Sequence, residues 1–79
     1  MTATAIIYVR LLDEVVDVWR PVQAVDLGGG RYRIVEQPYE ADIETWQFVP
    51  GDDVECEVVA MYEGPALTAV RTSRPIVGP

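Results

Sequence analysis

Apolar and polar side chains alternate along several short stretches of this chain, a pattern typical of half-buried β-strands. Residues 3–12 and residues 18–27 are rich in β-branched and aromatic side chains, and neither stretch shows the apolar stripe of a helix. Pro21 lies in the second stretch and cannot donate a ladder hydrogen bond, so we expect a bend, a bulge or a sheet edge there. The pattern therefore predicts two strands in this part of the chain.

A run of three glycines follows the second stretch. Gly28, Gly29 and Gly30 can each adopt positive φ, and strand-like composition resumes over residues 31–36. A glycine-rich segment cradles a phosphate when a helix N-terminus follows it, but here a strand follows. The run therefore predicts the turn of a β-hairpin.

The next stretch, residues 37–47, has no alternation and gathers acidic side chains. It is typical of a surface connection, with at most a helical turn over residues 41–46.

A second hairpin is predicted near the end of the chain. After a turn at Pro50 and Gly51, alternation places every second side chain from Val54 to Tyr62 on one apolar face of a strand. A tight turn and a last short strand over residues 66–71 complete a set of five strands.

Five short sequential strands joined by hairpins favour a small antiparallel barrel over a sandwich, which needs about seven strands. We therefore predict an all-β fold, a five-stranded antiparallel SH3-like barrel over residues 1–72, with residues 73–79 as a flexible C-terminal tail. An oligonucleotide-binding-type barrel is the alternative, although such barrels usually carry a helix between their third and fourth strands. A chain of 79 residues has room for one such domain.

Charge changes the picture because it is distributed unevenly. The formal net charge is −7, and residues 37–64 hold eight carboxylates and no basic residue. Such a surface repels nucleic acid and attracts a basic protein, although the same acidity would also serve solubility alone. The leading hypothesis is a non-enzymatic interaction module that binds a basic protein partner and no nucleic acid. The predicted contact residues are acidic or aromatic: Tyr39, Glu40, Asp42, Glu44, Trp46, Asp52 and Asp53.

The two tryptophans are expected to play different roles. Trp19 lies in an apolar setting and is expected to be buried. Trp46 is expected either to be partly exposed as a binding contact or to pack over the mouth of the barrel. The arginines of the first half are expected to pair with carboxylates of the same molecule.

The chain offers little for catalysis. It has no histidine, and its one cysteine, Cys56, falls on the predicted apolar face, where a thiol behaves as a small hydrophobe. Asp52, Asp53 and Glu55 could ligate a hard cation, but they lack the glycine and distal glutamate of a calcium-binding loop. We expect no cofactor and no catalytic residue, and keep a carboxylate-based metal-binding protein or enzyme as one alternative.

A second alternative is a structural domain that self-associates. Val59 and Met61 lie on the otherwise acidic face of the predicted fourth strand, where an edge could pair with its copy. The predicted state is a monomer or a weak homodimer.

The lone cysteine favours a reducing compartment, because it has no partner for an internal disulfide. The N-terminal apolar run is short and has no basic residues before it, so it predicts neither a secretory signal nor a membrane span. We therefore expect a cytoplasmic protein without membrane association.

The order of motifs also bears a resemblance. YVRLL, VDVWRPVQA, the glycine-rich turn, YRI and F-x-PGDDVECEV cover most of residues 8–59. In this pattern the chain resembles a group of short bacterial proteins of uncharacterised function, which implies a small bacterial domain and brings no activity or site. In size and charge alone, it also resembles the small acidic immunity proteins that neutralise secreted toxins.

Overall fold

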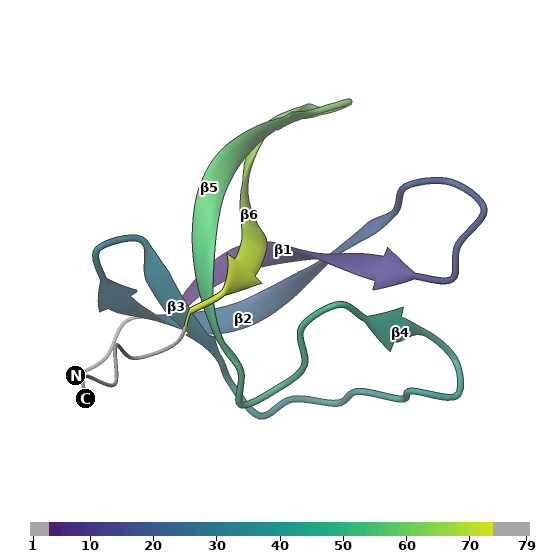
Figure 1. Ribbon diagram of the computed structural model, residues 1–79, viewed down its shortest axis with the longest axis horizontal. Helices are drawn as coiled ribbons and strands as arrows, with labels where there is room; N and C mark the ends of the chain where they lie inside the picture. The colour runs from purple at the N-terminus through teal and green to yellow at the C-terminus, as the bar shows by residue number, and fades with distance from the viewer. Residues whose placement is uncertain (1–3, 74–79) are drawn as a thin grey trace, which may run out of the picture.

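The structure is a computed structural model that describes residues 4–73, and all of the regular elements in that range are strands (Figure 1). The predicted all-β fold is confirmed. The part of the expected tail at residues 74–79 lies outside the described residues, as does residue 3 of the first expected strand. The strands are β1 (Thr4–Leu12), β2 (Trp19–Gly28), β3 (Arg31–Ile34), β4 (Thr45–Trp46), β5 (Asp53–Met61) and β6 (Gly64–Thr72).

Strand pairing forms a ring through five of the described strands, in the order β1, β2, β3, β5, β6 and back to β1. Each step from β1 to β6 is antiparallel, whereas the closing β6–β1 pairing is parallel. An odd number of strands requires this, because the direction reverses at each of the four steps and the fifth strand again runs with the first. Within the described residues, β1 and β6 are joined by one residue pair, Tyr8 with Thr68.

The core lies inside this ring. Its largest fully buried side chains come from β1, β2, β3 and β5, and on β1 they occupy alternate positions, as the pleat of a strand requires. Each such side chain stabilises the fold by about 1.5–3 kcal/mol relative to an exposed one. These side chains are Ile7, Val9, Val22, Ile34 and Val54, joined by Leu11, Ala24, Trp46, Phe48, Cys56 and Ala69.

The predicted glycine hairpin is confirmed. All three glycines have positive φ, from +65° to +88°, and Gly28 donates its N–H to the Asp26 carboxylate at 2.7 Å. Pro21 pairs with Tyr8 of β1, whereas the β2–β3 ladder starts only at Ala24. Pro21 therefore lies where β2 has a free edge within the described sheet, one of the positions that its missing N–H predicts.

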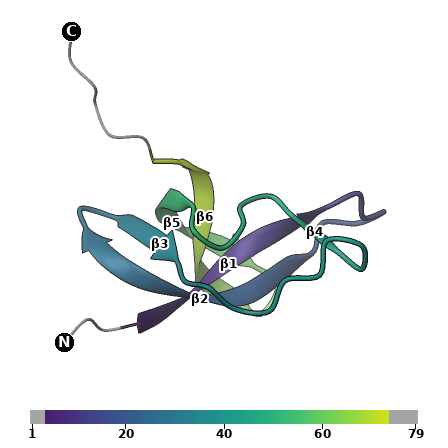
Figure 2. The same ribbon diagram turned by 90° about the horizontal axis from the view of Figure 1, so that it is seen from below.

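Two hairpin ends project beyond the ring. We call residues 12–19, which join β1 to β2, the first arm, and residues 57–67, the outer part of the β5–β6 hairpin, the second arm. Figure 1 shows the second arm rising away from β1 and β2, while the first arm extends to the side. Figure 2 shows the loop that carries β4 running along β1 and β2.

The predicted apolar face of β5 is right for the inner half of the strand and wrong for the outer half. Val54 and Cys56 are buried, but Val58 is 70% exposed and Tyr62 is fully exposed. The β3–β5 ladder ends at Glu55, next to a register shift, so beyond that point the described part of the sheet offers β5 only β6 as a neighbour. In the outer half, Val59 and Met61 on the opposite side of the strand are half-buried, whereas Val58 and Ala60 are exposed.

Ser73 is the one residue of the expected tail that the structure describes. Ser73 is buried and donates its backbone N–H to the Asp53 carbonyl at 2.8 Å. Ser73 therefore still belongs to the folded domain.

Candidate functional site

The seven predicted contact residues lie on the chain between β3 and the start of β5, which we call the acidic loop (residues 37–53). The loop is tied down at its start, where the Gln37 amide donates to the Gln23 and Val35 carbonyls at 2.9 Å each. A turn follows, in which the Glu40 carbonyl accepts the N–H groups of Ile43 and Glu44 at 3.0 Å. These bonds tie the start of the loop to β2 and close its turn.

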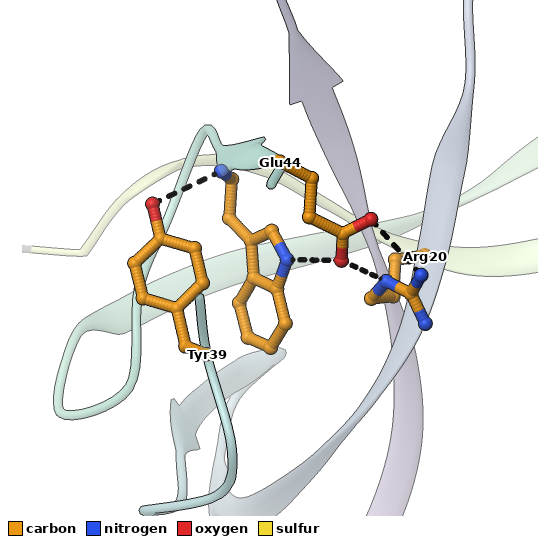
Figure 3. Close-up of polar contacts among 4 residues, drawn as sticks. Arg20, Tyr39 and Glu44 are labelled. Carbon is orange, nitrogen blue, oxygen red and sulfur yellow. Dashed lines mark hydrogen bonds and ion pairs between the residues drawn. The ribbon is translucent and has the colours of Figure 1, made fainter. Parts of the chain in front are cut away.

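Aromatic packing and an ion pair secure the middle of the loop (Figure 3). The Tyr39 and Trp46 rings pack with their centroids 4.7 Å apart, and the Tyr39 hydroxyl accepts the Trp46 backbone N–H at 3.4 Å. The Trp46 indole N–H donates to Glu44 Oε1 at 2.8 Å, and Glu44 also pairs with Arg20 of β2. These four residues form one connected cluster, which we call the anchor.

Within the anchor, the Glu44 carboxylate accepts hydrogen bonds from two side chains, Arg20 and Trp46. Hydrogen bonding from Arg20, and next from Trp46, lowers the pKa of Glu44 below its usual value. Glu44 is therefore ionised at neutral pH, and its oxygens are occupied by donors of the same chain. The anchor holds the loop against β2 and leaves little of Glu44 for a partner.

Of the two tryptophans, Trp46 is the more deeply buried. Trp46 is only 5% exposed and belongs to the core. Of the two roles expected for it, structural packing is therefore the one observed, and not partial exposure as a binding contact. Trp19, which we expected to be buried, is half-buried at the foot of the first arm. Local composition suggested otherwise, because Trp46 has polar neighbours in sequence but apolar neighbours in space.

The two aspartates at the end of the loop also serve the fold. Asp52 accepts the Val49 N–H at 2.9 Å and so closes the turn before β5. Arg33 donates to both carboxylate oxygens of Asp53, at 2.7 and 3.1 Å, and this hydrogen bonding lowers the pKa of Asp53. The structure therefore places both residues in contacts within the chain.

The remaining candidates, Glu40 and Asp42, are exposed on the turn of the acidic loop. Beside them Ile43 is 73% exposed, an apolar side chain set among carboxylates. A shallow hollow of about 230 Å³ lies next to it, lined in part by Pro38, Glu40 and Ile43. Sequence reasoning missed Ile43, although a branched apolar residue in a stretch without alternation was a usable signal.

Arginines neutralise part of the acidic segment. Of its eight carboxylates, four make ion pairs among residues 4–73: Glu44 with Arg20, Asp53 with Arg33, and Glu55 and Glu57 with Arg71. The predicted pairing of first-half arginines is confirmed for Arg20, Arg33 and also Arg10, which contacts Asp17 at 2.6 Å. The negative surface is thus narrower than the sequence suggested, and on the acidic loop it is concentrated at Glu40 and Asp42.

The described residues give no specific support to the metal or enzyme alternative. Within residues 4–73, no group of three or more cysteine, aspartate or glutamate side chains could hold a metal ion. Burial raises the pKa of Cys56 to about 11, so its thiol is protonated and unreactive at neutral pH.

The comparisons with known proteins leave the site to be judged on its geometry. In the part of the chain that the structure describes, no helix has the length and apolar character needed to cross a membrane. No protein-family model, no curated protein and no solved structure matches this chain.

Proposed function

We propose that this protein is a non-enzymatic interaction module that binds a basic protein partner through residues 40–43 of the acidic loop. The observation that carries the proposal is the exposed Ile43 with Glu40 and Asp42 beside it, on a turn whose base is held by the anchor. A loop that is already ordered loses little conformational entropy on binding, which leaves more of the contact energy for affinity.

The chemistry of this turn defines the partner. An exposed apolar side chain with two exposed carboxylates close by in the sequence fits an apolar pocket that has lysine or arginine at its edge, with Ile43 as the buried contact and the charges setting orientation and encounter rate. If the partner is a basic nuclease or toxin, the two carboxylates take the places that nucleic-acid phosphates occupy on it. Binding is then weakened by salt.

The same proposal includes the finer fold assignment. The sequential antiparallel order of β1, β2, β3, β5 and β6, with one core inside their ring, supports a small SH3-like barrel. On that scaffold the acidic loop is a long connection between two ring strands, the usual location of a binding segment.

A charge-reversal experiment tests the proposed surface. The full chain is immobilised and used to capture proteins from a lysate of the organism that encodes it, and captured proteins are identified by mass spectrometry. We expect the double variant Glu40→Lys/Asp42→Lys to lose a basic partner that the wild type retains. Ile43→Ser should weaken the same capture without changing any charge.

The matched control is Glu14→Lys/Glu36→Lys, which reverses two other exposed carboxylates and changes the net charge equally. It should keep the partner. If both double variants lose the partner equally, the loss is explained by overall net charge and not by this surface. If Glu40→Lys/Asp42→Lys captures the partner as well as wild type does, the proposed surface is wrong.

A further inference from the structure

An open groove of about 820 Å³ lies between the two arms, and none of its lining residues belongs to the 40–43 turn. Tyr8 of β1 and Trp19 of β2 line one side. Tyr8 lies between the fully buried Ile7 and Val9, so its side chain leaves the opposite face of the strand, outside the ring. Residues 60–67 of the second arm line the other side.

The groove runs along an unpaired strand edge. The edge of β6 that meets β1 at Thr68 continues over residues 64–67, and all four of these residues line the groove. Within the described chain, their ladder partner is β5 alone. Such an edge can accept an extended chain as an additional strand, with Pro65 contributing only its carbonyl.

The walls offer apolar contact on both sides of that edge. Trp19 and Leu67 are half-buried, Met61 is half-buried, and Tyr62 at the tip of the second arm is fully exposed. Met61 pairs with Gly64 and shares its face of the hairpin, whereas Leu67, three residues further along β6, lies on the other face. Side chains of an added strand alternate between its two faces, so they could pack on Met61 and on Leu67 in turn. Exposed aromatic and methionine surface of this kind is enriched at protein interfaces.

The carboxylates of the two arms outnumber the arginines that reach them. Residues 12–19 and 57–67 hold five carboxylates and no basic residue: Asp13, Glu14, Asp17, Glu57 and Glu63. Arg10 pairs with Asp17 and Arg71 with Glu57, whereas the other three make no ion pair among residues 4–73. Asp17 and Glu63 line the groove itself, and none of the described lining residues is basic.

We infer that this groove binds an extended segment of a partner protein, which pairs with the open edge of β6 and carries an arginine or lysine toward Glu63. The groove is a second surface, separate from the 40–43 turn, so the failure of either proposal leaves the other standing.

A peptide selection tests the inference. Random phage-displayed peptides of about ten residues, long enough to cover the edge at about 3.3 Å per residue, are selected against the immobilised full chain. We expect the recovered sequences to be enriched in arginine or lysine among β-branched and aromatic residues. A synthetic peptide from this set should bind less tightly as salt is raised.

Variants locate the binding site of that peptide. Glu63→Arg, on an exposed turn, and Trp19→Ala should each weaken binding by about tenfold or more, as expected for a central contact. The control Glu36→Arg makes the same charge change outside the groove and should bind within about twofold of wild type. Thermal melting of each variant confirms that the fold is retained, and bound peptide should slow amide hydrogen exchange most within residues 64–67, at Gly64, Ala66 and Leu67, which carry an N–H.

Four outcomes overturn the inference. They are recovery of no enriched sequence, enrichment of acidic peptides, equal binding by Glu63→Arg and Glu36→Arg, and unchanged exchange at residues 64–67 in the bound state. Light scattering tests for a fifth outcome that would also overturn the inference: the free wild-type protein has the mass of a dimer, and Glu63→Arg has the mass of a monomer. The occupant would then be a second copy of this chain.

Discussion

The inner and outer halves of the β5–β6 hairpin differ in what surrounds them, although the same two strands build both. Val54 in the inner half is fully buried, whereas Val58, on the same side of the strand by alternation, is 70% exposed. The inner half has β3 beside it and the ring's core beneath it, while in the outer half the described sheet supplies only the hairpin's own ladder. Alternation thus shows which side of a strand can be buried, and the neighbouring elements decide whether it is.

The same contrast between covered and uncovered side chains applies to the two tryptophans, where we expect the largest effect on stability. Trp46→Ala should lower the free energy of unfolding by about 3–5 kcal/mol, because it leaves a cavity in the core and removes the support of the acidic loop. Trp19→Ala, at the foot of the first arm, should cost less than half as much. Urea denaturation followed by circular dichroism measures both, and equal losses would contradict the assignment of Trp46 to the core.

A closer test uses two valines of one strand. Val54→Ala should cost about 2 kcal/mol, because buried methyl groups leave a void that the ring fills only in part. Val58→Ala makes the same chemical change four residues later and should stay within about 0.5 kcal/mol of wild type. A loss at Val58 comparable to that at Val54 would mean that the outer half is covered in solution, as it would be in a dimer.

The smallest expected effect is the dependence of the free energy of unfolding on pH at acidic pH. The pKa values of Asp53 and Glu44 are lowered in the folded state, so on acidification the unfolded chain takes up protons first. Their stabilisation is complete above their usual pKa values, about 4, and is lost as the pH falls through the lower folded values.

This sign gives a measurable difference. Asp53→Asn should remove about 0.5–1 kcal/mol at neutral pH and flatten the loss of stability below about pH 4, since its ion pair with Arg33 is partly exposed. Denaturation midpoints of Asp53→Asn and wild type between pH 2 and 7 measure this difference, and identical profiles for the two proteins would contradict the role of that pair.

Local signals predicted the parts of this fold that depend on local chemistry. Three glycines with positive φ make the first hairpin turn, and Gly51, with φ +95°, lies in the predicted turn before β5. The closing pair Tyr8–Thr68 joins the first and last described strands and has no signature in the sequence around either residue. The strand pattern therefore predicted five of the six described strands. It missed β4, at the end of the stretch where at most a helical turn was expected, and it did not predict the extent of the ring.

The candidate site was predicted less well, and for a physical reason. Carboxylates can be counted along the chain, but the arginines that neutralise them come from other strands: Arg20 of β2 for Glu44, and Arg33 of β3 for Asp53. Only packing separates these from Glu40, which keeps its charge toward solvent. A cluster of one sign in sequence therefore overstates the charge available to a partner.

The single residue pair that joins β6 to β1 has a consequence for biosynthesis. Tyr8 and Thr68 lie far apart along the chain, and closing a long stretch of chain costs conformational entropy. We therefore expect the β6–β1 pairing to form late during synthesis, after the ribosome has released β6.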